Sequence, residues 1–178
     1  MTHATLVAVV VAVISGMMLA EARVSRANER ALLAHGAVGP RGDLFALVAV
    51  LYPVLLVGMG IEGLQRPARL PVPSDAGPAW FLSGALLFVA SKALKYWAIS
   101  ALSGRWTFRI LVIPGAPLVR SGPYRFVKHP NFIAVIGELA GAAMMCGALV
   151  TGTAGVGVYG LVLWRRARIE ERALKEYA

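Results

Sequence analysis

Long uninterrupted runs of apolar residues constrain the fold of this chain more than any other feature. They lie at about 4–20, 44–61, 79–99 and 132–150, and a shorter one follows at 154–164. Hydrophobic residues make up 58% of the 178 residues and are gathered in these blocks, instead of alternating or recurring on one helix face. A helix needs about 20 such residues to cross a bilayer. The sequence therefore predicts an all-α integral membrane protein.

The runs predict five membrane helices, the last two forming a C-terminal hairpin around the turn-like residues 151–153. The fifth run is short for a full crossing. The first run has the length of a signal peptide, but no basic segment precedes it and further spans follow. We therefore expect it to be retained as a helix.

The basic residues predict one orientation. Loop 21–43 holds four Arg, segment 102–130 holds five Lys and Arg, and the tail from Arg165 holds five, together 14 of the 18. Loop 62–78 holds two. Because basic loops stay in the cytoplasm, we expect an external N-terminus and a cytoplasmic C-terminus. The net charge of +9 then reflects membrane topology, and nucleic acid is not an expected partner.

Two lysines and the cysteine lie within apolar runs. Lys92 and Lys95 come late in the third run, where long stems can carry their ammonium groups to the interface beside Tyr96 and Trp97. Their simplest interpretation is as interface anchors. Cys146, the single cysteine, has no partner for an internal disulfide and should serve packing.

Two further segments have a structural interpretation. Residues 107–113 are short and apolar, and we expect them to lie along the membrane surface or to line a pocket rim. Residues 155–160 match a glycine-rich dinucleotide motif by letter, but no strand precedes them. Their small residues are more typical of close helix contact.

A polar, basic loop at residues 121–132 separates the third and fourth runs. Pro130 suits the first turn of a helix, which places His129 just outside it. The free N–H groups there attract polar or anionic ligand atoms, and Asn131 adds an amide. Glu138 follows seven residues later on the same face, and a carboxylate at membrane depth should face a partner or a cavity.

A second ionic cluster ends the chain. Arg168 and Glu171 are three residues apart and would be neighbours on a helix. Such pairs are commonly solvated, but this one lies at the end of a membrane span, on the side predicted for His129. The two polar patches together indicate a reaction site.

The Gly-Pro-Tyr-Arg-x-x-x-His-Pro-Asn-Phe stretch and the Arg-x-Glu-Glu-x-x-Leu ending resemble the isoprenylcysteine carboxyl methyltransferase family. Segments 95–99, 105–107, 112–115 and 26–30 resemble its bacterial branch, which is associated with type III polyketide synthases and O-methylates alkylpyrones and alkylresorcinols. The resemblance implies a single methyltransferase domain over 1–178, with a catalytic core at about 79–178. It also implies a bacterial inner-membrane location and a functional link to such a synthase.

The resemblance implies that S-adenosylmethionine binds in a cytoplasmic pocket between the His-Pro loop and the C-terminal helix, while a lipophilic acceptor enters from the membrane lipids. Three residues are expected to act in catalysis: His129, Arg168 and Glu171. The expected cofactor-binding residues are Gly122, Pro123, Tyr124, Val127, His129, Pro130, Asn131, Phe132 and Glu170. The expected acceptor-binding residues are Trp97, Trp106 and Glu138, and no metal site is expected.

Two departures from the family pattern stand out. Phe132 replaces a tyrosine common in the motif, and the chain stops at Ala178 without the longer tyrosine-containing tail of the eukaryotic enzymes.

Methyl transfer from a sulfonium to oxygen depends on alignment and on exclusion of water. A phenolic acceptor, with a pKa near 10, must also lose a proton, for which Glu171 or His129 could serve. The alternatives are a prenylcysteine carboxylate as acceptor, a non-catalytic lipid-binding protein, and an NADPH-dependent membrane reductase.

Overall fold

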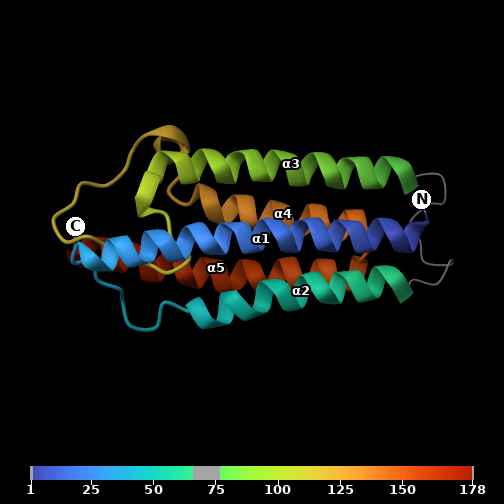
Figure 1. Ribbon diagram of the computed structural model, residues 1–178, viewed down its shortest axis with the longest axis horizontal. Coiled ribbons are helices and arrows are strands. Elements are labelled where there is room, and N and C mark those ends of the chain that lie inside the picture. Colours follow the sequence, from blue (N-terminus) through green and yellow to red (C-terminus); the bar gives the residue numbers. More distant parts are fainter. Residues whose placement is uncertain (1, 66–76, 178) are drawn as a thin grey trace.

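Five α-helices run side by side in an elongated bundle in the computed structural model, which describes residues 2–65 and 77–177 (Figure 1). Two 3₁₀ helices, η2 (Ser103–Arg105) and η3 (Gly122–Arg125), lie in the connection between α3 and α4. Within the described residues the only strand-like pairing is one isolated bridge, Val38 to Val112, so the all-α class is confirmed. The α-helices are α1 (His3–Ala34), α2 (Phe45–Gln65), α3 (Gly77–Leu102), α4 (Pro130–Cys146) and α5 (Leu149–Tyr177).

Three helical segments of the described chain are long and apolar enough to cross a membrane: α1, α2 and 77–105. Helix α4 is also apolar but has only 17 residues. Helix α5 has 29 residues, apolar in its first half and highly charged after Trp164. These lengths and compositions are those of a membrane protein, whereas five complete crossings stay a prediction.

The structure corrects two predicted boundaries. Helix α1 continues to Ala34, although its apolar run ends near residue 20, because residues 21–34 contain neither Gly nor Pro and are rich in helix-forming Ala, Arg and Glu. The α4–α5 turn is at Gly147, which adopts φ 68° at the end of α4. Residues 151–153, predicted as the turn, belong to α5, so the hairpin forms four residues earlier than expected.

Glu62 explains why α5 begins before its apolar run. The Glu62 carboxylate accepts hydrogen bonds from the backbone N–H groups of Val150, at 2.9 Å, and Thr151, at 2.7 Å. These are free donors of the first turn, which a carboxylate satisfies while also complementing the helix dipole. A side chain of α2 therefore fixes the start of α5.

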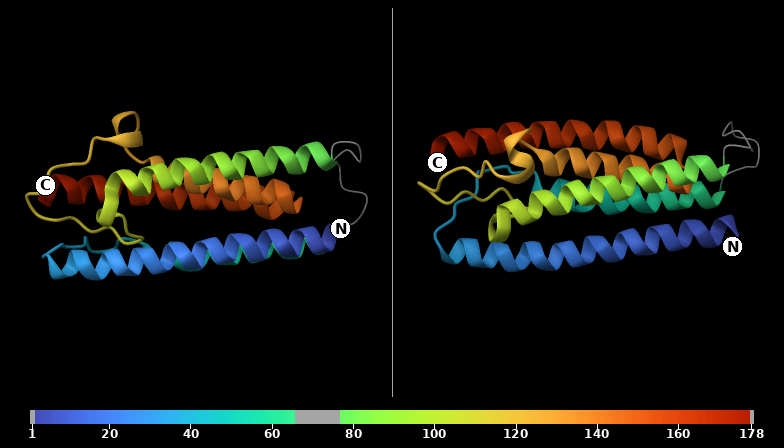
Figure 2. Two further views of the ribbon diagram at one scale, coloured as in Figure 1. Left: turned by 45° about the horizontal axis from the view of Figure 1, so that its top comes forward. Right: turned by 90° about the horizontal axis from the view of Figure 1, so that it is seen from above.

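The two ends of the bundle differ in composition. Figures 1 and 2 show the C-terminal end of α1, the α3–α4 connection and the C-terminus at one end, with the N-terminus at the other. The three basic segments thus gather at one end, as the charge distribution predicts. Which face of the membrane this end meets stays a prediction.

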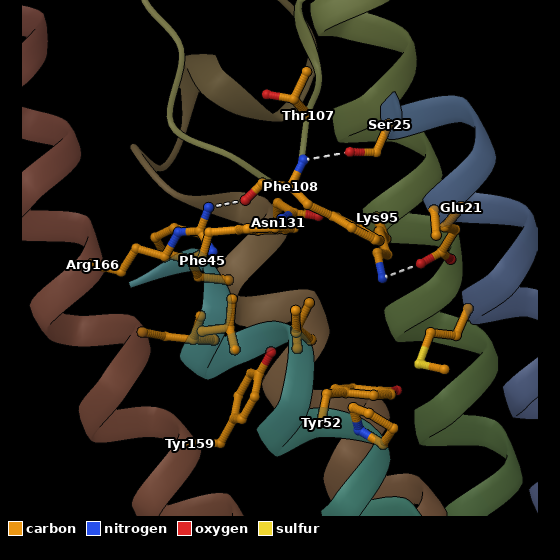
Figure 3. A pocket seen from close by; sticks show the side chains of 18 of the residues that line it. Glu21, Ser25, Phe45, Tyr52, Lys95, Thr107, Phe108, Asn131, Tyr159 and Arg166 are labelled. Atoms are coloured by element: carbon orange, nitrogen blue, oxygen red, sulfur yellow. Dashed lines mark hydrogen bonds and ion pairs between the residues drawn. The ribbon is translucent and has the colours of Figure 1, made fainter. Parts of the chain in front are cut away.

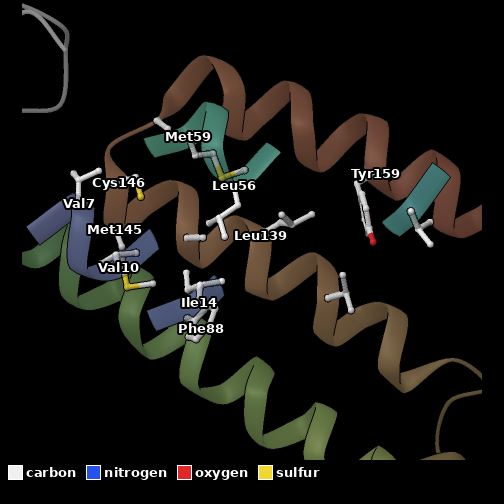
Figure 4. Close-up of a cluster of buried hydrophobic side chains, with 14 of the residues drawn as sticks. Val7, Val10, Ile14, Leu56, Met59, Phe88, Leu139, Met145, Cys146 and Tyr159 are labelled. Atoms are coloured by element: carbon white, nitrogen blue, oxygen red, sulfur yellow. The ribbon is translucent and has the colours of Figure 1, made fainter. Parts of the chain in front are cut away.

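Close packing of α3 against α4 fixes the register of the bundle. A Cβ atom on Gly141 would lie 2.7 Å from the Gly84 carbonyl oxygen, so only glycine permits this approach. The apolar core continues from this contact through all five helices, with Ile14, Leu56, Phe88, Leu139 and Tyr159 among its members (Figure 4). Cys146 is buried in it, which confirms its expected packing role.

We expect Glu62→Ala to destabilise the protein by about 0.5–2 kcal/mol, the usual cost of losing a helix N-terminal cap. Glu62→Gln keeps one acceptor oxygen, so its stability should lie between that of Glu62→Ala and that of the wild type. Thermal unfolding in detergent micelles measures both. Unfolding of Glu62→Ala at the wild-type temperature would contradict the capping role.

Candidate functional site

The segment before α4 is positioned by its glycine and its prolines. Gly122 adopts φ 57°, and a Cβ atom there would lie 2.8 Å from the Ala101 Cβ, so glycine lets η3 pack closely on α3. Pro123 is buried, and Pro130 occupies the first turn of α4, where its missing N–H costs no hydrogen bond. His129 is the residue immediately before α4.

His129 connects this segment to α5. Its Nδ1 atom lies 3.4 Å from Glu170 Oε2 and its Nε2 atom 3.3 Å from Glu171 Oε1, while its ring stacks on Phe132 at a centroid distance of 5.2 Å. A hydrogen bond to Glu170 is the largest influence on His129 and raises its pKa above 6.5, with Glu171 adding to the shift. Both ring nitrogens can donate only when the ring is protonated. The geometry therefore favours the imidazolium form.

A cavity of ≈ 80 Å³ lies beside His129, and we call it the loop cavity. Its walls come from the segment after α3, from the N-terminus of α4 and from α5. Aromatic, acidic and basic side chains all face it: Arg105, Trp106, Tyr124, Lys128, His129, Asn131, Phe132, Arg166 and Glu170. Such a mixture suits a polar, zwitterionic ligand with a flat ring.

A second cavity of ≈ 280 Å³ lies within the helix bundle, and we call it the bundle cavity (Figure 3). All five α-helices contribute to its walls, as do Thr107 and Phe108. Apolar residues on α1 and α2 line one side, including Met18, Leu19, Val48 and Ala49. Leu19 and Ala49 are also exposed on the outside of the bundle, so the cavity wall here continues into the surface that faces lipid.

The two cavities share one wall, formed by Thr107, Asn131, Phe132 and Arg166. Arg166 is buried, donates from Nη2 to the Phe108 carbonyl oxygen, and lies within 4.0 Å of no carboxylate of the described residues. Its Nε atom and the Asn131 Oδ1 atom are buried without a hydrogen-bond partner in the same part of the chain. Buried polar atoms are rarely left unpaired. A ligand at this wall would satisfy them.

Four buried charges lie at one side of the bundle cavity, and we call Glu21, Lys92, Lys95 and Glu138 the ion quartet. The first three line the cavity, and Glu138 lies behind them. Glu21 binds both lysines, with Nζ–Oε distances of 2.6 Å. Glu138 lies 3.1 Å from Lys92 and 3.4 Å from Lys95, and Tyr52 donates a hydrogen bond of 3.3 Å to it. The interpretation of both lysines as interface anchors is therefore wrong, because each is at most 6% exposed and points into the bundle.

Five of the predicted cofactor residues line the loop cavity: Tyr124, His129, Asn131, Phe132 and Glu170. Trp106, predicted to bind the acceptor, lines the same cavity, and its Nε1 atom has no partner within the described chain. Gly122, Pro123, Val127 and Pro130 lie in the backbone around these residues without lining it. Thr107 and residues 109–112 line it, which agrees with one of the two possibilities expected for residues 107–113.

Four further predicted residues line neither cavity: Trp97, Glu138, Arg168 and Glu171. Arg168 is exposed and stacks on Trp164, one turn earlier on the outer face of α5. Trp97 is 48% exposed and packs against Phe126. Glu171 is partly exposed and is held by His129 and Lys128. Glu138 belongs to the ion quartet and lies behind the bundle cavity.

Sequence reasoning missed Arg166, Glu21 and Ser25. Arg166 lies four residues before Glu170, so one helical turn places both on the face that lines the loop cavity. That spacing was visible in the sequence, whereas the Arg168–Glu171 spacing marks a face of α5 that lines neither cavity. Glu21 and Ser25 were missed because the first helix was expected to end at residue 20. Ser25 accepts a hydrogen bond of 2.7 Å from the Phe108 N–H, which fixes the rim of the site to α1.

Two bacterial proteins are similar over most of their length, and no solved structure gives a significant match. The "Uncharacterized protein YpbQ" of Bacillus subtilis (strain 168) is 29% identical over 168 residues, 94% of this chain and 96% of that protein. An "Uncharacterized protein" of Haemophilus influenzae is 29% identical over 154 residues, 85% of this chain and 84% of that protein.

The model of the isoprenylcysteine carboxyl methyltransferase (ICMT) family matches residues 84–176. This stretch is more than half of the chain, and it contains α4, α5, the loop cavity and the shared wall. The chain therefore belongs to the isoprenylcysteine carboxyl methyltransferase family, a family of membrane methyltransferases.

Proposed function

We propose that this protein is an S-adenosylmethionine-dependent O-methyltransferase whose acceptor is a lipophilic phenol or alkylpyrone. One observation carries the proposal: the loop cavity and the bundle cavity meet at a wall of only four residues. A methyl donor in the first and an acceptor in the second would face each other across that wall. Methyl transfer by in-line displacement requires such an alignment.

The loop cavity suits S-adenosylmethionine, which supplies a methyl group on a positively charged sulfonium. The Glu170 carboxylate and the ring faces of Tyr124 and Phe132 can attract cationic groups. Arg105 and Lys128 can bind a carboxylate. The unpartnered Nε1 of Trp106 and Oδ1 of Asn131 offer one further donor and one further acceptor. The lining residues therefore offer partners for the cationic groups and the carboxylate of this zwitterionic ligand.

The bundle cavity suits a lipophilic acceptor. Its α1 and α2 side is apolar, and the exposed Leu19 and Ala49 connect it to the surface that would contact lipid tails. An alkyl chain can lie along this side, while a polar head group reaches the polar wall. Substrate would then enter from the bilayer, where such molecules partition.

Arg166 is the residue best placed to act on the reacting oxygen, because it faces both cavities and has an unpartnered donor. Its positive charge would stabilise an acceptor oxygen that carries negative charge. His129 contacts a carboxylate through each of its ring nitrogens, so we assign it the role of holding the segment before α4 against α5.

A prenylcysteine carboxylate is the second candidate acceptor, and the buried Arg166 specifically favours it. A carboxylate arrives ionised and matches a guanidinium in geometry and charge. The pH dependence separates the candidates. The rate with a phenol should rise with pH through the titration of the acceptor or of a base, whereas a carboxylate requires no such rise.

We further propose that the basic end of the bundle, which carries the loop cavity, faces the cytoplasm of a bacterial inner membrane. S-adenosylmethionine would then reach its cavity directly from the cytoplasm. A type III polyketide synthase, which makes alkylresorcinols and alkylpyrones, is the expected functional partner.

The direct test uses purified protein in bilayer nanodiscs with tritium-labelled S-adenosylmethionine. An alkylresorcinol, an alkylpyrone and a prenylated cysteine are offered as acceptors. We expect labelled methyl ethers of the first two. Methyl ester on the cysteine alone would establish the second candidate, and absence of both cofactor binding and transfer would contradict the enzyme proposal.

We expect Arg166→Leu to lower kcat/KM by roughly 10- to 100-fold, because the acceptor oxygen loses a hydrogen bond to a charged group, which typically contributes about 1.5–3 kcal/mol. Arg168→Leu is the matched control, since it removes the same charge two residues away on the outer face of α5. It should leave kcat/KM nearly unchanged. Equal losses in the two variants, with both folded by circular dichroism, would contradict the assignment of Arg166.

The His129 ring should titrate above pH 6.5 in an NMR titration of protein labelled at histidine, with His129→Gln identifying its signal. Glu170→Gln should lower the His129 pKa more than Glu171→Gln, because Glu170 is the larger influence. Stabilisation by these ion pairs is fully present below pH 6.5 and is lost as the pH rises through the elevated His129 pKa. It also needs ionised glutamates, and His129 lowers the Glu171 pKa below 4.5.

A His129 pKa at or below 6.5 would contradict this prediction. A larger change of the His129 pKa in Glu171→Gln than in Glu170→Gln would contradict it as well. Thermal unfolding supplies a second readout. The difference between wild type and Glu170→Gln should shrink from pH 6 to about pH 9 as His129 deprotonates.

A further inference from the structure

The ion quartet is a polar feature that alignment of a methyl donor and its acceptor does not explain. Glu138 lies eight residues after Pro130, the first residue of α4, which is ~12 Å along a helix that rises 1.5 Å per residue. Charged side chains at such a depth are costly, and apolar residues of similar size commonly give a more stable core. The quartet therefore calls for a functional explanation.

The charges of the quartet balance one another. Two ammonium groups face two carboxylates, and both oxygens of Glu21 are used, Oε1 by Lys92 and Oε2 by Lys95. A ligand at this position consequently needs no net charge. Each lysine, however, has three N–H donors and only two carboxylate partners in the quartet. One donor on each lysine can serve a neutral oxygen.

The position of these donors relative to Arg166 is informative. Lys92, Lys95 and Glu21 line the bundle cavity, whereas Glu138 is fully buried behind them. In Figure 3, Arg166 and the Lys95–Glu21 pair lie on opposite sides of this cavity. A head group within it would thus meet a guanidinium at one edge and an ammonium group at another.

We propose that Lys92 and Lys95 bind a second oxygen of the acceptor head group, a carbonyl or hydroxyl on a different edge from the oxygen that is methylated. This inference rests on the proposed function and refines it. The quartet then determines specificity: it selects rings that carry two oxygen groups and orients the reacting oxygen toward Arg166. Glu21 and Glu138 hold the lysines in place and do not contact the methyl acceptor.

The test compares two acceptors that differ by one oxygen, an alkylresorcinol and a meta-alkylphenol with the same chain. A hydrogen bond to a charged group typically contributes about 1.5–3 kcal/mol. The wild type should therefore show a kcat/KM roughly 10- to 100-fold higher for the alkylresorcinol. Lys95→Met and Lys92→Met should each bring this ratio closer to one, because only the resorcinol loses a contact.

Lys175→Met is the matched control, since Lys175 is exposed and lines neither cavity. It should keep the wild-type ratio. If a single lysine variant does not fold, the double variant Glu21→Gln/Lys95→Met removes one charge of each sign and leaves the Lys92–Glu138 pair. The same fall in ratio is expected for this variant.

Two results would overturn the inference while leaving the proposed function intact. One is equal kcat/KM of the wild type for both acceptors. The other is a similar loss for both acceptors in the lysine variants, with an unchanged ratio, which is the result of a purely structural quartet. Failure of the wild type to methylate either compound would instead contradict the proposed function, and this inference with it.

Discussion

Pairing of buried charges is the constraint on which the site depends. Each charged side chain placed inside a bilayer costs about 2.5–3.5 kcal/mol on insertion scales, so four isolated charges would oppose assembly of the bundle. Glu21, Lys92, Lys95 and Glu138 come from three helices and meet only when α1, α3 and α4 are correctly aligned. The quartet thereby specifies which helices are neighbours, and it places polar donors on the wall of the bundle cavity.

Backbone proximity makes this pairing possible. The contact between Gly84 and Gly141 brings α3 and α4 close together. The Glu138 side chain on α4 therefore lies beside Lys92 and Lys95 on α3. At the other end of the same helices, His129 holds the preceding segment to Glu170 and Glu171. Two sets of contacts between acidic and basic groups thus hold the site together. The ion quartet is buried in the bundle, and the contacts of His129 with Glu170 and Glu171 are partly exposed.

Much of the fold was predictable from the apolar runs, and parts of the site were not. Hydropathy and charge predict the all-α class, the helices and the gathering of the basic segments at one end. A bilayer requires long apolar helices, and basic residues collect on one side of it. The His129 segment was evident from its prolines and its polar residues. Arg166 was missed because α5 carries five basic residues after Trp164, and only the face of the helix distinguishes Arg166 from Arg168. Glu21 was missed because hydropathy ends α1 too early, although the helix-forming residues beyond it extend the helix to Ala34.

The length of α1 has a consequence for how this architecture can diversify. The matched family region, residues 84–176, supplies the loop cavity and the shared wall, whereas α1 and α2 lie outside it and supply the apolar side of the bundle cavity together with Glu21. In the proposed function, the methyl-donor site is therefore encoded within the matched region, whereas the acceptor site draws on both stretches: Glu21 and the apolar side come from α1 and α2, and Lys92 and Lys95 come from α3. Replacement of α1 and α2 would then change the surface that holds the acceptor chain and leave the methyl-donor site unchanged.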